Sequence, residues 1–157
     1  MSEIIPIDDY RSEFSPVATS FASCVTFQAY FNDIHFPDVF TMPNGFTFTR
    51  LGSSQFFISS LRSGLRFDDL GIQIDLPEPK SDVQLVLFGA AGQRPAGEFA
   101  VDLFIDVAAT DDSGSVIDSA RVPNDQFIYL VQLTGEGIVS VTVAGGVEGH
   151  LVQVCAS

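Results

Sequence analysis

Residues 72–87, Ile-Gln-Ile-Asp-Leu-Pro-Glu-Pro-Lys-Ser-Asp-Val-Gln-Leu-Val-Leu, carry the pattern that decides the fold class. Apolar side chains occupy every second position, first over 72–76 and again over 83–87. A two-residue period is that of a β-strand, whereas a helix needs apolar residues three and four positions apart. The Leu-Pro-Glu-Pro segment at 76–79 is typical of a turn, so we expect two strands separated by that turn.

The same period recurs along the rest of the chain. Further alternating runs lie at 46–49, 101–108 and 139–143. Turn-forming residues separate the runs at 43–45, 111–114, 123–125, 135–137 and 145–146. Segment 111–114 is expected to close a hairpin between strands at 98–108 and 115–122. No segment shows a convincing helical period. Short strands with frequent turns predict an all-β fold, an antiparallel β-sandwich of jelly-roll type.

The composition predicts one folded domain preceded by an arm. The chain has 157 residues, 46% of them hydrophobic, which is enough for one core. Strand patterns begin near residue 22, so we expect a sandwich over 22–157 and an N-terminal arm over 1–21. The first residues lack the features of a secretory signal, and no run is long enough to span a bilayer. The compartment stays open, with an extracellular or particle-associated protein among the candidates.

The net charge of −13, with only seven Lys and Arg residues, restricts the possible partners. Phosphate backbones and anionic lipid surfaces would be repelled, so neither nucleic-acid binding nor membrane insertion is expected. Cations, basic partners and solubility are the roles that remain for the charge.

Two cysteines, Cys24 and Cys155, lie in short apolar runs near the two ends of the expected sandwich. If the first and last strands are neighbours, the two sulfur atoms meet and form a disulfide in an oxidising compartment. The alternative is a pair of unpaired buried thiols. In either case we expect the two residues to be close in space.

The paired acids Asp68, Asp69, Asp111 and Asp112 are the candidates for a metal site. They flank expected turns and offer carboxylate oxygens, the ligands that calcium prefers. The alternative is that they are solvated turn residues. Apart from calcium, no cofactor is expected.

Catalysis finds little support in the sequence. The chain has two histidines and no nucleophile motif beside either of them. Asp102 and Asp106 share one face of a strand, but about 13 Å between them is too far for glycoside hydrolysis. We therefore expect a protein that is not an enzyme.

Fifteen phenylalanines and no tryptophan indicate packing rather than an aromatic sugar platform. Phe56 and Phe57 are adjacent, so in a strand one of them points away from the core. Several Phe residues therefore become candidates for an interface between subunits in a homo-oligomer whose arm crosses to a neighbour. These candidates are Phe14, Phe21, Phe31, Phe36, Phe40, Phe56 and Phe57.

From about residue 22 to 155 the chain resembles bacterial jelly-roll modules of the carbohydrate-binding and galactose-binding-like type. The resemblance is carried by the runs at 24–27, 71–77, 138–143 and 151–155, and by the Asp-Asp-Ser-Gly hairpin at 111–114. It implies two face-to-face antiparallel sheets and ligand binding by loops at one end.

Two functions follow from these observations. The first is a non-enzymatic structural subunit of a particle, fibre or surface layer, indicated by the Phe content, the absent Trp and the arm. The alternative is a glycan- or calcium-binding module, which the resemblance and the acidic turns imply.

Overall fold

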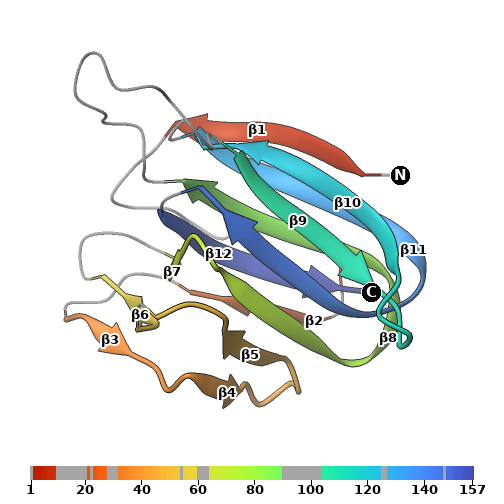
Figure 1. Cartoon of the computed structure of the whole chain (residues 1–157), viewed down its shortest axis with the longest axis horizontal. Helices are drawn as coiled ribbons and strands as arrows, with labels where there is room; N and C mark the ends of the chain where they lie inside the picture. The colour runs from red at the N-terminus through yellow and green to blue at the C-terminus, as the bar shows by residue number, and fades with distance from the viewer. Residues whose placement is uncertain are drawn as a thin grey trace.

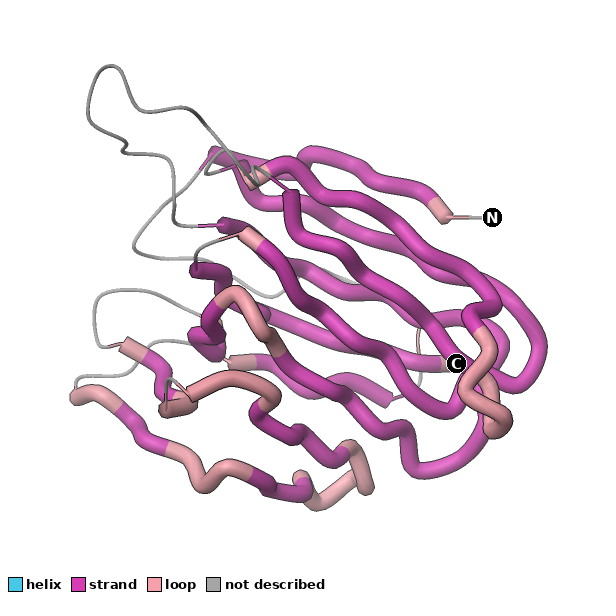
Figure 2. Tube along the Cα trace, in the orientation of Figure 1, coloured by secondary structure: helices cyan, strands magenta, loops and turns pink. Residues whose placement is uncertain are grey.

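The computed structural model describes residues 2–9, 21, 23–27, 32–53, 55–59, 64–89, 104–124, 127–146 and 148–157. Strands and the loops between them make up this part of the chain, and none of it is helical (Figure 2). The twelve strands are β1 (Glu3–Asp9), β2 (Ser23–Thr26), β3 (Ile34–His35), β4 (Val39–Thr41), β5 (Thr47–Arg50), β6 (Phe57–Ile58), β7 (Leu65–Asp68), β8 (Ile72–Gly89), β9 (Phe104–Thr110), β10 (Val116–Pro123), β11 (Phe127–Gly145) and β12 (Glu148–Ala156). All pairs between them are antiparallel, which confirms the predicted all-β class. Among the described residues no helix is long and apolar enough to cross a bilayer.

Two long strands, β8 and β11, pair with each other in both layers of the sandwich (Figure 1). Residues 82–87 of β8 pair with 129–134 of β11, and this half of the strand pair also pairs with β12 and β1. Residues 72–75 pair with 140–143, and this half continues to β5 and β4 on one side and to β9 and β10 on the other. The inward side chains of both halves belong to one apolar core, which is the arrangement of a sandwich.

The turns predicted at 76–79 and 135–137 are bends within continuous strands. The ladder between β8 and β11 is irregular there. The paired residues on β11 skip from Thr134 to Ile138, and those on β8 skip from Lys80 to Asp75. No described strand pairs with 76–79, so its two prolines remove no ladder hydrogen bond. On β11, Gly137 has a φ of 76°, which favours glycine. The predicted turn at 111–114 does close a hairpin, between β9 and β10.

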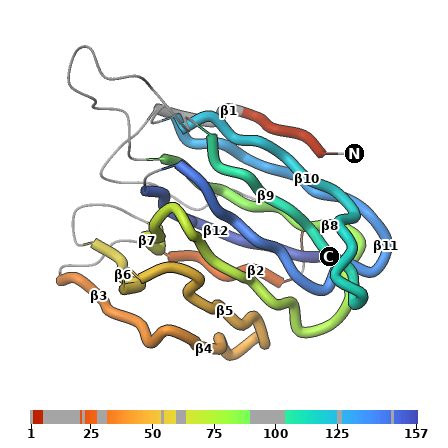
Figure 3. Tube along the Cα trace, in the orientation of Figure 1, coloured from red at the N-terminus to blue at the C-terminus, as the bar shows by residue number. Residues whose placement is uncertain are grey.

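Part of the predicted N-terminal arm is a strand of the sandwich. Residues 3–9 form β1, which pairs with 127–132 of the same chain, so red and blue segments lie side by side in Figure 3. The arm boundary at residue 21 is therefore wrong for these residues. The reason is that a backbone ladder needs no clean side-chain period. Residues 10–20 lie outside the described part of the chain, and the homo-oligomer stays a prediction.

A cluster of five phenylalanines fills one side of the core. Phe40 stacks on Phe36 and Phe48, with centroids 4.6 and 5.1 Å apart, and the edges of Phe27 and Phe56 complete the group. Three predicted interface residues thus pack within their own chain: Phe56 is buried in the core, and Phe36 and Phe40 are partly buried against it. Of the other candidates, Phe57 is half-buried, Phe21 is half-buried, and Phe14 and Phe31 lie outside the described residues.

The two cysteines are joined, as one of the two sequence hypotheses had it. Cys24 on β2 and Cys155 on β12 are directly opposite in the ladder, with Cα atoms 4.1 Å apart, and they form a disulfide. The bond connects residues 131 positions apart. It therefore holds the short edge strand β2 against the last strand of the chain.

Replacing both cysteines by serine should lower the free energy of unfolding by about 4–5 kcal/mol, because a loop of this length greatly restricts the unfolded chain. Urea denaturation of the oxidised protein and the C24S/C155S double variant measures the difference. Equal midpoints with equal slopes would show that the bond does not stabilise the fold.

Candidate functional site

The acidic turns lie at opposite ends of the sandwich. Asp69 accepts a hydrogen bond through its carbonyl from Gly145, which pairs with Ile105 at the start of β9. Asp111 follows Thr110, at the other end of the same strand. The two predicted calcium pairs therefore do not combine into one site.

The Asp111 carboxylate is used within its own turn. One oxygen accepts hydrogen bonds from the Ser113 hydroxyl at 2.6 Å, the Ser113 amide at 2.9 Å and the Ser115 amide at 3.0 Å. These bonds, the Ser113 hydroxyl first, lower the pKa of Asp111. Asp112 is exposed beside it. Such a carboxylate shapes a hairpin turn without any metal.

The Asp68 carboxylate connects two loops. One oxygen accepts from the amides of Leu70 and Gly71, and the other accepts from the amide of Ser53 at 3.0 Å. A Cβ at Gly52 would collide with this carboxylate, so a larger residue there would displace the Asp68 side chain from its hydrogen bonds. Among the described residues, no three His, Cys, Asp or Glu side chains gather as metal ligands.

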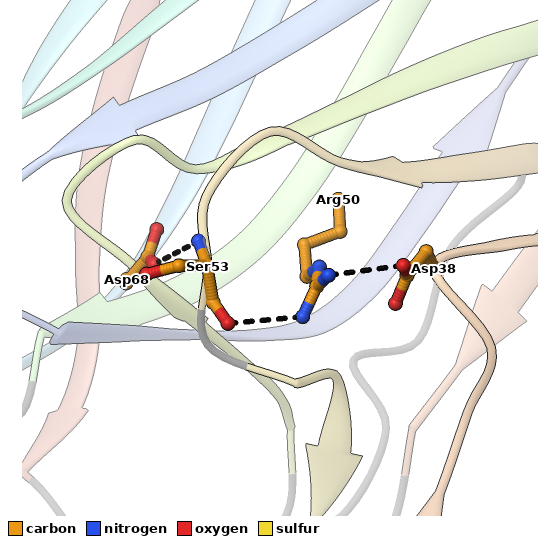
Figure 4. A network of polar contacts seen from close by, with 4 residues as sticks. All are labelled: Asp38, Arg50, Ser53 and Asp68. Carbon is orange, nitrogen blue, oxygen red and sulfur yellow. Dashed lines mark hydrogen bonds and ion pairs between the residues drawn. The ribbon is translucent and has the colours of Figure 1, made fainter.

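Arg50 extends this network at the same end of the sandwich. Its guanidinium donates to the Asp38 carboxylate at 2.9 Å and to the Ser53 carbonyl at 3.0 Å, as Figure 4 shows. The loop before β4, the loop after β5 and the β7–β8 turn are thereby held together. Every charged group of the network has a partner inside it, so we assign it a structural role.

A second row of side chains crosses neighbouring strands on the outer face of β7. His35, Phe57, Arg66 and His150 are paired in register from β3 to β12, and His150 stacks on Phe88 of β8 at 4.8 Å. The guanidinium of Arg66 lies 5.3 Å from the centre of the Phe57 ring, and His35 lies 5.7 Å away. The ring therefore contacts a neighbour on each adjoining strand, which leaves little of it for a ligand.

Glu148 anchors this row electrostatically. Its Oε1 atom is 3.4 Å from His150 Nε2 and accepts a hydrogen bond from Arg66 Nε at 2.6 Å. The contact with His150 and the bond and charge of Arg66 lower the pKa of Glu148 from 4.5 to about 2, against the opposing effect of burial. The carboxylate is thus anionic at all ordinary pH values.

This lowered pKa predicts a change in acid stability. The stabilisation by Glu148 is fully present above pH 4.5 and is lost as the pH falls through about 2. In Glu148→Gln, the free energy of unfolding should lose that pH-dependent part, about 1–2 kcal/mol after allowing for solvent screening. Glu78→Gln is the matched control, because Glu78 pairs with Lys80 at the exposed surface. Urea titrations at pH 5, 4, 3 and 2 measure the difference, and parallel curves for wild type and Glu148→Gln would contradict it.

A groove of about 530 Å³ lies beside β9 and β10, where the start of the chain approaches them. Its polar lining comes from an ion pair between Arg121 and Asp106, with Nε and Oδ1 2.9 Å apart, and from Ser2 and Ser119. Its apolar lining consists of Ile4, Val107, Ala108, Val116 and Ala120. This volume falls in the range of small-molecule sites.

An exposed aromatic ring lies beside Arg121, one of the residues that line this groove. Phe104 is 43% exposed, and the guanidinium of Arg121 lies 5.3 Å from its centre. Arg121 and Asp106 have side chains 65% and 61% exposed, whereas those of Arg66 and Glu148 are each 29% exposed. The two Arg–carboxylate–Phe groups share their chemistry, but the one in the groove is the more open to a ligand. It is therefore our candidate site.

The sequence indicated only part of this site. The alternation over 101–108 predicted a strand there, and both Phe104 and Asp106 are exposed on β9. The other half of the earlier pair, Asp102, lies outside the described residues. The groove also needs β1, which joins the sheet by pairing with β11, and no local pattern near residues 2–4 signals that position.

The chain is similar to some solved structures, at low sequence identity. No family model matches the sequence, and no curated protein matches it. Among solved structures, the chain is similar to the module CsCBM6-3 from Clostridium stercorarium in complex with cellobiose, with a TM-score of 0.38 and 11% identity. It is also similar to a family 6 carbohydrate-binding module studied by crystallography and calorimetry, with a TM-score of 0.39 and 8% identity. Each comparison covers 86% of this chain and 92% of the other.

Proposed function

We propose that this chain is a non-catalytic binding module whose ligand is a neutral glycan, held in the groove beside β9 and β10. The observation that supports the proposal is the combination of an open groove of about 530 Å³ with an Arg121–Asp106 pair on its wall. Phe104 beside that pair adds an exposed aromatic surface.

The groups in the groove suit the chemistry of a sugar. Hydroxyl groups both donate and accept hydrogen bonds, so a guanidinium, a carboxylate and a serine hydroxyl such as Ser119 can each bind one. The carbon-bound hydrogens of a sugar ring form an apolar surface, which small residues such as Ala108 and Val116 can contact. A few polar groups on a largely apolar lining are typical of ligand sites.

A neutral ligand fits the charge of the chain better than an acidic one. The net charge is −13, and an anionic glycan would approach against that field. In the groove itself, Arg121 is already paired with Asp106. A ligand carboxylate would therefore meet no unpaired cation among the described groove residues.

The arrangement of carboxylates supports a binding role over a hydrolytic one. Hydrolysis of a glycoside ordinarily needs two carboxyl groups, and Asp106 is the one among the described groove residues. Asp68 and Glu148 are opposite each other on β7 and β12. However, the pKa of Glu148 is about 2, so it holds no proton to donate to a leaving group.

The assembly hypothesis loses two of its supports. Residues 3–9 belong to the sheet of their own chain, Phe56 is buried in the core, and Phe36 and Phe40 pack against that core. A homo-oligomer remains a prediction that light scattering at working concentrations tests.

The glycan proposal is tested with two matched substitutions. We expect the protein to bind at least one neutral oligosaccharide on a glycan array, and Arg121→Met to weaken that binding about tenfold or more in calorimetry, because hydrogen bonds to a charged group are lost. Arg66→Met is the control, since Arg66 also pairs with a carboxylate and lies 5.3 Å from a Phe ring. Its affinity should stay close to wild type.

Three results would reject the proposal. The first is an array without binding to any neutral glycan. The second is equal loss of affinity in both variants, and the third is unchanged affinity in Arg121→Met.

The affinity for the glycan should be the same in the presence of calcium and in the presence of a chelator, because the one described carboxylate in the groove is paired with Arg121.

A further inference from the structure

The two residues of the disulfide differ in how far they are exposed. Cys155 is fully buried at 0% exposure, whereas Cys24 on the edge strand β2 is half-buried. A thiol from solution therefore reaches the sulfur of Cys24 more readily. Attack on one sulfur expels the other as a thiolate, so this asymmetry selects Cys155 as the leaving group.

A buried thiolate would ordinarily be costly, but Cys155 has a hydrogen-bond donor. The side-chain amide of Gln153 donates to Cys155 Sγ at 3.2 Å, and Gln153 is itself 3% exposed. A hydrogen bond to a charged acceptor is stronger than one to a neutral acceptor. The amide therefore stabilises the thiolate more than the intact disulfide, which makes Cys155 a better leaving group.

We propose that Cys24–Cys155 is a reducible latch that opens in one direction, with attack at Cys24 and departure of Cys155 onto the Gln153 amide. This inference goes beyond glycan binding and does not depend on it. The reductant is a dithiol. Its thiolate forms a bond to Cys24 Sγ, and the electron pair of the broken S–S bond goes to Cys155 Sγ, which then takes a proton from water.

The second thiolate of the reductant completes the reaction. It attacks the reductant's own sulfur in the mixed disulfide, and the bond to Cys24 breaks with its electron pair going to Cys24 Sγ, which then takes a proton from water. The reductant ends as a disulfide, having lost two electrons, and the protein ends with two thiols.

Opening the latch affects one edge of the sandwich. β2 has four residues, and its ladder is with β12 alone among the described strands. Phe27, directly after β2, contacts the rings of Phe36, Phe40 and Phe48. Loss of the bond therefore loosens the attachment of the Phe cluster, while β9 and β10 lie elsewhere in the sheet.

The direction of opening is tested by trapping the mixed disulfide. The oxidised protein is treated with glutathione, a monothiol, then alkylated and mapped by mass spectrometry. We expect glutathione on Cys24 and the alkyl group on Cys155. Glutathione chiefly on Cys155, or equally on both residues, would overturn the proposal.

The role of Gln153 is tested by kinetics. Reduction of Gln153→Leu by dithiothreitol should be about tenfold slower than that of wild type. Gln84→Leu is the control, because Gln84 is also buried and lies opposite Cys155 on β8. It should be reduced at the wild-type rate. Equal rates for Gln153→Leu and wild type, or equal slowing of both variants, would overturn the assignment. Thermal melts of the oxidised variants show whether each is folded during the measurement.

Discussion

Pairing between β8 and β11 in both layers of the sandwich is the constraint on which the rest of the structure depends. Backbone groups of a buried strand must be hydrogen-bonded, so two strands that pass from one layer to the other must bend together. The bends lie where ladder partners are missing and where prolines at 77 and 79 or glycines at 135 and 137 occur. Every other strand then attaches, directly or through its neighbours, to one half of this strand pair.

The two Arg–carboxylate–Phe groups illustrate how the same side chains serve different purposes. Arg66 lies in a row shared by several strands, and Glu148 and Phe57 contact further neighbours there. Arg121 lies on β10, an edge strand beside a groove, and its partner Asp106 is exposed. The difference comes from position in the sheet and not from residue type, because a central row supplies neighbours that an edge does not.

The sequence predicted what depends on local pattern. Alternation fixed the strand faces over 72–76, 83–87 and 104–108, and turn residues fixed the hairpin at 111–114. Whether Pro77 would end the strand could not be predicted, because proline disrupts a strand only where the neighbouring strand needs a backbone hydrogen bond that proline cannot donate. The inward position of Phe40 depends on contacts with distant rings. The groove could not be predicted for the same reason, since it is lined by residues 2 and 4 together with residues more than 100 positions later in the chain.

The place of β12 in the sheet has a consequence for how the chain acquires its shape during synthesis. This last strand lies between β8 on one side and β2 and β7 on the other. A chain that emerges N-terminus first therefore keeps the early strands β2 and β7 without their partner until residues 148–156 have appeared. β1 likewise has no pairing partner until β11 has been synthesised. Such distant pairings make folding slow, and they leave apolar strands unpaired for longer than a fold built from local hairpins would.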